Sequence, residues 1–344
     1  MGPNQATNLI ATSVRSSGEE ALLSVDDLHV EFRIADGVVN AVNGLSYEVH
    51  RGETVAILGE SGSGKSVSAQ AIMGIIDTPP GFITKGELKF KGNDLLKMSE
   101  PERRAIRGDN ISMVFQDALS SLNPVFSVGW QIGEMFRKHR GMNKKDSLKA
   151  AAELMDRVKI PDAAKRVRAY PHEFSGGMRQ RIMIAMSIAL DPDVLIADEP
   201  TTALDVTVQA QIMDLLEDLQ TETGLGLVLI THDLGVVAEV ADRVVVMYAG
   251  RAVEKGTVHE VFGRPRHPYT EGLMKSIPRT DQQLDRLQPI TGSPPDLMKI
   301  PSGCPFRPRC PYAKEQCALV EPPLVEVLGT EHSSACLRIE EIFQ

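Results

Sequence analysis

At 344 residues, the chain has room for two domains, or for one large domain with a smaller one, and 42% hydrophobic residues is ordinary for a globular protein. No apolar run approaches the roughly 18–20 residues that span a bilayer, so we expect no integral membrane segment. The net charge of −9 argues against bulk attraction to nucleic acid or to anionic lipid.

The first 20 residues are polar and lack the basic-then-apolar plan of a secretion signal, so we expect a disordered leader there. Strands are predicted over residues 22–32 and 38–49, and a short buried strand over residues 54–58. A helix is predicted over residues 66–76, because its apolar residues share one side.

A glycine-rich stretch lies between that buried strand and that helix, and it matches G-x-x-x-x-G-K-[ST], the phosphate-binding loop of nucleotide-binding proteins. Its residues are Gly59, Glu60, Ser61, Gly62, Ser63, Gly64, Lys65 and Ser66. The glycines let backbone N–H groups turn toward an anion, and the helix N-terminus adds unpaired donors. We expect Lys65 to reach the outer phosphates of a bound nucleotide and the Ser66 hydroxyl to ligate Mg²⁺. Phe32, at the end of the strand predicted over residues 22–32, is a candidate for stacking on adenine, although a half-buried strand aromatic fits equally well.

Beyond a break at residues 78–81, we predict an edge strand over residues 86–90, a helix capped near Ser99 and a buried strand over residues 111–115. Gln116 follows that strand directly. Since open α/β sheets place ligand groups at the carboxyl ends of their strands, Gln116 is a candidate to contact Mg²⁺ or a water there; the alternative is a polar residue that only caps the strand. Residues 128–168 are predicted as a helical insert with a solvated, charged face.

A second helix start with phosphate-binding potential follows, where a serine N-cap and two glycines precede an apolar helix over residues 182–190. Its candidate residues are Ser175, Gly176, Gly177, Met178 and Gln180. Alone, the pattern also fits an ordinary capped helix, but this chain has two such helix starts.

The next buried strand, residues 194–199, ends in two carboxylates. We expect Asp198 to hold Mg²⁺ through water beside Ser66, and Glu199 to orient an attacking water or accept its proton. A helix predicted over residues 208–220 comes after Ala203, Leu204 and Asp205. His232, just after a strand predicted over residues 226–230, is a candidate to hydrogen-bond a γ-phosphate, or a structural histidine.

A hairpin over residues 244–254 and a helix over residues 257–262 precede a proline-rich stretch, so we predict a boundary near residue 263. All four cysteines lie beyond it: Cys304, Cys310, Cys317 and Cys336. In a cytosolic chain such clustering suggests a metal rather than disulfides, and four thiols can hold zinc or a [4Fe–4S] cluster. Plain reduced thiols are the third alternative.

Together, these motifs resemble the ATPase subunits of ATP-binding-cassette (ABC) transporters, in which six of them occur in the same order. They are the phosphate loop, Gln116, the segment from Ser175 to Gln180, the strand ending at Glu199, the segment from Ala203 to Asp205, and His232. In the tail, His267-Pro268-Tyr269-Thr270 and Gly303-Cys304-Pro305-Phe306 resemble the oligopeptide and dipeptide importer branch, most closely its D-type ATPase subunits.

The resemblance implies an α/β fold of the P-loop NTPase class with a mixed β core, a helical subdomain at about residues 125–190 and a small loop-rich C-terminal domain with four cysteines. The implied organisation is a leader over residues 1–20, an ABC ATPase domain over residues 21–262 and a tail over residues 263–344. It also implies an enzyme that hydrolyses ATP to power peptide import across the bacterial inner membrane, bound peripherally at the cytoplasmic face.

In such importers, the ATPase pairs head to tail with a second ATPase, under two membrane permeases that receive peptide from an extracytoplasmic binding protein; nucleic acid is no partner. The resemblance implies catalytic roles for Glu199, His232 and Gln116, with Ser66, Gln116 and Asp198 around Mg²⁺. The Ser175 segment would face the partner's nucleotide, and Ala203, Leu204 and Asp205 would form a loop between the two subunits. In the tail, a [4Fe–4S] cluster is favoured over Zn²⁺. Alternatives are an importer ATPase for a nickel chelate, an antimicrobial peptide or a murein peptide, and a cassette ATPase acting on nucleic acid or ribosomes.

Overall fold

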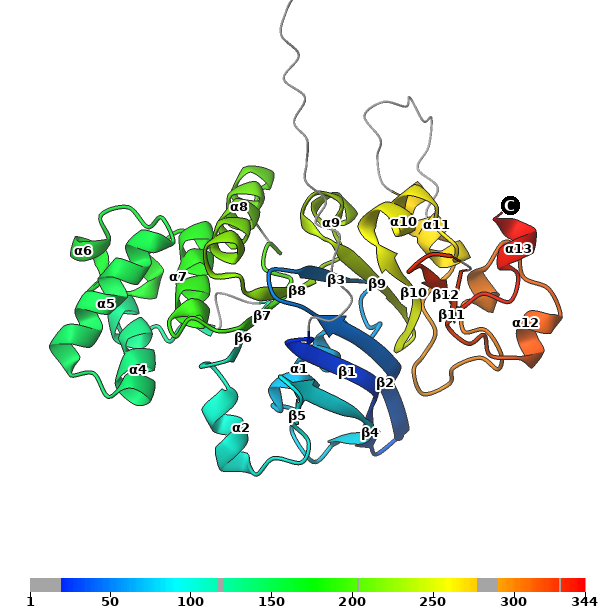
Figure 1. Ribbon diagram of the computed structural model, residues 1–344, viewed down its shortest axis with the longest axis horizontal. Coiled ribbons are helices and arrows are strands. Elements are labelled where there is room, and N and C mark those ends of the chain that lie inside the picture. The colour runs from blue at the N-terminus through cyan, green and yellow to red at the C-terminus, as the bar shows by residue number, and fades with distance from the viewer. Residues whose placement is uncertain (1–19, 117–120, 203, 277–289, 328, 344) are drawn as a thin grey trace, which may run out of the picture.

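The computed structural model describes residues 20–116, 121–202, 204–276, 290–327 and 329–343 (Figure 1). The predicted leader, apart from Glu20, lies outside the described residues. None of the described helices has the length and apolar character needed to cross a bilayer.

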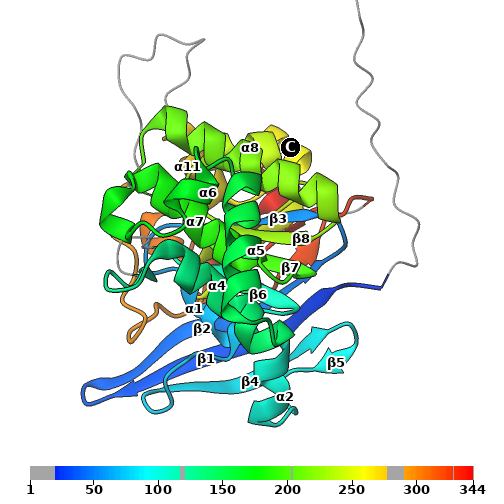
Figure 2. The same ribbon diagram turned by 90° about the vertical axis from the view of Figure 1, so that its left-hand side faces the viewer.

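A small antiparallel sheet forms one side of the molecule, with strand order β2-β1-β4-β5 (Figure 2). Its strands are β1 (Leu23–Ile34), β2 (Gly37–Val49), β4 (Gly81–Phe90) and β5 (Asn93–Asp94). The prediction of an edge strand near residues 86–90 is wrong in its placement, because β4 pairs with β1 on one side and with β5 on the other. The two-residue β5 is too short to be seen in the sequence pattern.

The main sheet has the order β11-β12-β10-β9-β3-β8-β7-β6 and is mixed, as the resemblance implies. Its strands are β3 (Thr54–Leu58), β6 (Ile111–Val114), β7 (Val194–Asp198), β8 (Gly226–Ile230), β9 (Arg243–Tyr248), β10 (Arg251–Thr257), β11 (Val325–Glu326) and β12 (Ser333–Ser334). The five strands from β9 to β6 are parallel, and their residues are nearly all buried. Near-continuous apolar runs suit strands that are covered on both faces.

Helices cover the main sheet, and a group of helices lies beyond it on one side of the molecule (Figure 1). The helices that connect strands are α1 (Lys65–Met73), α2 (Glu100–Ile106), α8 (Val206–Thr223), α9 (Leu234–Val240) and α10 (Val258–Gly263). A separate helical group projects beyond β6: α4 (Val128–Arg140), α5 (Lys144–Arg157), α6 (Ala163–Arg166) and α7 (Gly176–Ile188). One hydrophobic cluster runs from Ile132 in this group to Leu195 in the sheet, which fixes the start of α7 relative to the strands.

The C-terminal region is built onto the main sheet. It contains α11 (Pro268–Lys275), the 3₁₀ turn η2 (Arg307–Arg309), α12 (Gln316–Leu319), β11, β12 and α13 (Ile339–Ile342). Strand β12 pairs with β10, and the buried pair His332 Nε2–Glu254 Oε1, 2.6 Å apart, spans the same junction. Tyr269 and Phe306 pack with Tyr248 of β9 in one cluster. The tail and the main sheet therefore share one hydrophobic core.

Candidate functional site

The phosphate loop connects β3 to α1, as the sequence predicts, and two of its glycines are required by close backbone contacts. A Cβ at Gly59 would lie 2.3 Å from the Met247 carbonyl oxygen, and one at Gly64 would lie 2.2 Å from the Ala41 carbonyl oxygen. Both residues also have positive φ, which favours glycine. The helix that follows ends at Met73, three residues earlier than predicted, because Gly74 adopts the left-handed conformation that ends helices.

Lys65 is buried at the base of this loop. Its Nζ donates to the carbonyl oxygens of Gly59, at 2.7 Å, and Glu60, at 3.1 Å. Burial lowers the pKa of this ammonium, while the carboxylates of Glu199, Asp198 and Glu60 oppose that shift. The charged group is thus held inside the loop, where phosphate oxygens can replace the two carbonyls as acceptors.

The Ser66 hydroxyl and the Asp198 carboxylate come together although 132 residues separate them in the sequence. Ser66 Oγ donates to Asp198 Oδ1 at 3.0 Å. Burial raises the pKa of Asp198, with the Glu199 charge adding to that effect, and the Ser66 hydrogen bond opposes it. A hydroxyl beside a carboxylate at the end of the phosphate loop is a fitting donor set for Mg²⁺ carried by ATP.

Glu199 is the centre of a polar cluster that includes both other predicted catalytic residues. Gln116 Nε2 donates to Glu199 Oε2 at 2.8 Å, and His232 Nδ1 lies 3.3 Å from Glu199 Oε1. Glu199 has φ of 47°, an uncommon value for a non-glycine residue, and its N–H donates to the Ile230 carbonyl on β8. The carboxyl ends of three parallel strands, β6, β7 and β8, place these groups side by side.

Thr202 belongs to the same cluster and was not predicted from the sequence. Its Oγ1 donates to Glu199 Oε2 at 2.8 Å. Its position three residues after Glu199, in a turn, is the signal that could have identified it, since hydroxyl side chains bond neighbours at that spacing.

The segment from Ser175 to Gln180 begins α7 with the predicted N-cap: the Ser175 hydroxyl accepts from the Met178 N–H. Ser175 and Gly176 are exposed, so this helix start is open to a second molecule. A Cβ on Gly177 would lie 2.5 Å from Val208 Cγ1 of α8, which explains the second glycine by packing. Gln180 is 4% exposed, so it is less accessible to a partner than the exposed Ser175 and Gly176 or the half-buried Gly177 and Met178.

Of the segment predicted to lie between subunits, Ala203 is outside the described residues. The Leu204 N–H donates to the Thr201 carbonyl, and Asp205 caps α8 by accepting from the Val208 N–H. Phe32 pairs with Val39 and Gly81 in the small sheet and packs against the apolar core, so its stacking on adenine stays a prediction.

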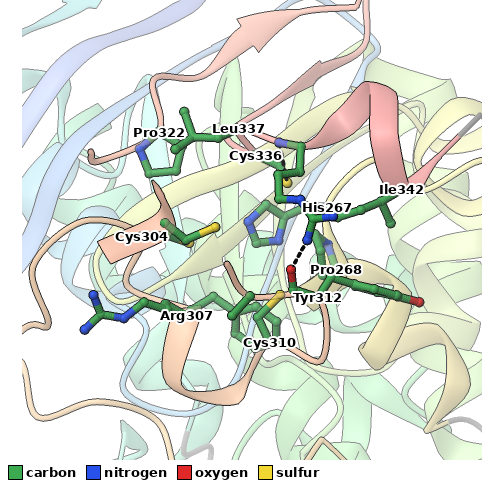
Figure 3. A pocket seen from close by; sticks show the side chains of 14 residues that line it. His267, Pro268, Cys304, Arg307, Cys310, Tyr312, Pro322, Cys336, Leu337 and Ile342 are labelled. Carbon is green, nitrogen blue, oxygen red and sulfur yellow. Dashed lines mark hydrogen bonds between the residues drawn. The ribbon is translucent and has the colours of Figure 1, made fainter. Parts of the chain in front are cut away.

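All four cysteines have free thiols and line one pocket, with His267, Phe306 and Tyr312 among its other walls. Figure 3 shows Cys304, Cys310 and Cys336 around this pocket. Burial raises the pKa of Cys304 and Cys336, and that of Cys310 to about 11. Within the described residues, no group of three or more His, Cys, Asp or Glu side chains is placed to hold a metal ion. The predicted cluster or zinc site therefore has no ready-made ligand set.

Comparison with known proteins agrees with this geometry. Residues 42–202 match the family described as ABC transporter, and residues 253–317 match the family described as oligopeptide/dipeptide transporter, C-terminal region. The chain is 52% identical to the dipeptide transport ATP-binding protein of Bacillus subtilis, over 88% of this chain and 90% of that protein. It is 50% identical to the oligopeptide transport ATP-binding protein of Salmonella typhimurium, over 93% of this chain and 95% of that protein.

Solved structures with the same fold are ATP-binding cassettes. One, dimeric and in a post-hydrolysis state with ADP and phosphate, superposes with a TM-score of 0.61 at 26% identity and covers 69% of this chain and 98% of its own. Another, cbiO1 from Clostridium perfringens, which is part of the ABC transporter complex cbiONQ, has a TM-score of 0.59 at 30% identity and covers 71% of this chain and 92% of its own. Family profiles, relatives and fold agree: this chain belongs to the ATP-binding subunits of ABC transporters, in the oligopeptide/dipeptide branch.

Proposed function

We propose that the chain is the ATP-hydrolysing subunit that powers the import of dipeptides or oligopeptides through an ABC importer of the bacterial inner membrane. The observation that carries this proposal is the convergence of Lys65, the Ser66–Asp198 pair and the Gln116–Glu199–His232 cluster at one edge of the parallel sheet. Phosphate-binding, metal-binding and water-activating groups thus lie together, as phosphoryl transfer to water requires.

The residues divide the chemistry among themselves. The backbone N–H groups of the loop and the Lys65 ammonium bind the phosphates, and Ser66, Gln116 and Asp198 would surround the Mg²⁺ of MgATP. When bound, this ion offsets the charge of the β- and γ-phosphates. Glu199 orients water and accepts its proton, while His232 hydrogen-bonds the γ-phosphate.

We propose further that hydrolysis occurs where two ATPase subunits meet. The exposed Ser175 and Gly176 at the start of α7 offer an anion-binding helix N-terminus to the nucleotide of a second ATPase, whose equivalent segment completes the site of this chain. ATP then holds the two subunits together, and loss of the γ-phosphate contacts after hydrolysis lets them separate. In this proposal the chain lies peripherally on the cytoplasmic face, under two permeases supplied by a peptide-binding protein.

Reconstitution tests this proposal. The chain is combined with its cognate ATPase and permeases in lipid vesicles, and ATP hydrolysis is measured with and without the peptide-loaded binding protein. We expect hydrolysis that rises with bound peptide and depends on both ATPases. Solutes released from the purified binding protein identify the class of solute that is transported. If that protein carries only a nickel chelate, the proposed substrate is a nickel chelate and not a peptide.

We also propose that the four-cysteine pocket holds a [4Fe–4S] cluster, with zinc as the alternative. Support comes from its four thiols, the donors that such clusters use, and from its apolar surroundings. We expect a brown protein with about four irons per chain after anaerobic purification. A colourless protein with one equivalent of zinc would show that the pocket holds zinc instead of the cluster. A protein that contains neither iron nor zinc would show that the four cysteines are reduced thiols.

A further inference from the structure

The C-terminal tail reaches the phosphate loop through one buried arginine. Arg309 lies at the end of η2, immediately before Cys310, and its side chain is 4% exposed. Its guanidinium donates a hydrogen bond from each terminal nitrogen to the Glu60 carboxylate: Nη1 to Oε2 at 2.5 Å and Nη2 to Oε1 at 2.9 Å. The pair joins residues 249 positions apart, and paired contacts of this kind are among the stronger charge-assisted hydrogen bonds.

Arg309 is itself held in place. Its Nε donates to the Thr291 carbonyl at 3.1 Å, and its guanidinium lies 5.8 Å from the Tyr248 ring centre and 6.0 Å from that of Phe306. The Glu60 hydrogen bonds raise the pKa of Arg309, which keeps the group charged throughout the accessible pH range. A fixed cation, rather than a mobile surface side chain, therefore meets the loop.

A second tail residue holds the backbone at the same point. The Glu60 N–H donates to the Tyr269 hydroxyl at 2.9 Å, and this tyrosine is fully buried in the cluster that it forms with Tyr248 and Phe306. The Glu60 carbonyl oxygen accepts from the Ser63 N–H at 3.2 Å and from Lys65 Nζ at 3.1 Å. The side chain, N–H and carbonyl of Glu60 are thus all engaged, and two of its four partners, Arg309 and Tyr269, belong to the tail.

We propose that Arg309 is a positioning residue for nucleotide binding: through Glu60 it holds the phosphate loop in the shape that receives the phosphates of ATP. The inference rests on the proposed ATPase function and assigns the tail a role at that site. Without this contact the loop must be ordered when ATP binds, and the entropy lost in ordering it weakens affinity. Since Arg309 does not contact Glu199, the chemical step itself should change little.

Nucleotide titration of the full-length chain tests the proposal apart from transport. We expect Arg309→Gln to raise the Kd for ATP about tenfold, the size expected for lost charge-assisted hydrogen bonds, and to raise KM for ATP with kcat within about twofold of wild type. Arg251→Gln is the matched control, because Arg251 pairs with Glu321 at 2.5 Å and so also ties the tail to the sheet. Its Kd should stay at the wild-type value.

A double-mutant cycle separates the Arg309–Glu60 contact from general damage to the tail. Glu60→Gln alone should weaken ATP binding, and adding Arg309→Gln to it should cause little further loss. Tyr269→Phe, which removes only the hydroxyl that accepts from Glu60, should weaken binding several-fold, and it decides the question if Arg309→Gln does not fold. Unchanged Kd in the single variants, fully additive losses, or an equal loss in Arg251→Gln would overturn the inference. Wild-type chain that binds no ATP would overturn the proposed function as well.

Discussion

Glu199 accepts from Gln116 and Thr202 and lies beside His232, so its carboxylate is positioned by three neighbours. We predict that Glu199→Gln keeps ATP affinity, because the amide has nearly the same shape and the phosphates are bound by the loop. Turnover should fall by about 10² to 10⁴, the usual contribution of a general base. Phosphate release and ATP titration, measured on the same preparation, check both halves of the prediction.

The matched control for this variant is Glu217→Gln, the same exchange at an exposed position of α8. It should hydrolyse ATP at the wild-type rate. Near-normal hydrolysis by Glu199→Gln would remove Glu199 from the chemistry and leave it as a residue that holds Gln116 and His232 in place.

Lys65 should act on binding rather than on turnover alone. Its buried ammonium donates to two carbonyls inside the loop. No other described residue of the loop carries a positive charge that could replace it. Lys65→Ala should raise the Kd for ATP by about 10- to 100-fold, since hydrogen bonds to charged groups contribute about 1.5–3 kcal/mol each. Titration with a fluorescent ATP analogue measures this, and the exposed Lys149→Ala on α5 serves as the control. An unchanged titration would contradict the assigned role.

At the scale of elements, the attachment of the tail should depend on pH through His267, the N-cap of α11. Burial lowers the pKa of His267 from 6.5 to about 3, so the folded chain keeps this ring neutral. The unfolded chain takes up a proton near 6.5. His267 therefore contributes stability that is fully present above about pH 6.5 and is lost progressively as the pH falls toward 3.

His267→Asn tests this contribution. Asparagine keeps a side-chain acceptor for the Tyr269 N–H that His267 Nδ1 now caps, but it does not titrate. The protection factors of the tail amides, which correct for the intrinsic pH dependence of hydrogen exchange, should fall more from pH 7 to pH 5 in wild type than in this variant. His139→Asn, at an exposed position of α4, should keep the wild-type dependence. Parallel pH profiles for wild type and His267→Asn would exclude His267 as the titrating group.

The elements that carry local signals were predictable from the sequence, and those that depend on distant partners were not. Buried parallel strands are visible in the sequence as apolar runs. The bounds of β3, β6, β7 and β8 therefore agree with the predicted bounds to within a residue or two. The phosphate loop and the Ser175 cap are short-range patterns. By contrast, β11 and β12 have two residues each; β12 depends on the pairing edge of β10, and β11 on that of β12.

The same distinction applies within the site. Gln116, Glu199 and His232 were predictable because each directly follows an apolar strand, and strand ends meet in a parallel sheet. Nothing near Glu60 or Arg309 in the sequence indicates their contact, because the chain must place η2 against β9 before the two charges can meet. Long-range ion pairs between a loop and a tail leave no periodic pattern.

At the scale of the whole molecule, we propose that the exposed start of α7 is needed for hydrolysis by the assembled pair but not for the folding of one subunit. Gly176 is the position at which to test this. A Cβ there would meet only Leu204 Cδ2, at 3.7 Å, and an acidic residue in the first turn of a helix is favourable. We predict that Gly176→Asp folds and binds ATP at its own loop with wild-type affinity, yet lowers hydrolysis in the assembled pair, because the new carboxylate repels the partner's γ-phosphate. ATP titration of the isolated chain and phosphate release by the reconstituted pair separate the two effects. If the variant pair hydrolyses ATP at the wild-type rate, the start of α7 does not face a nucleotide.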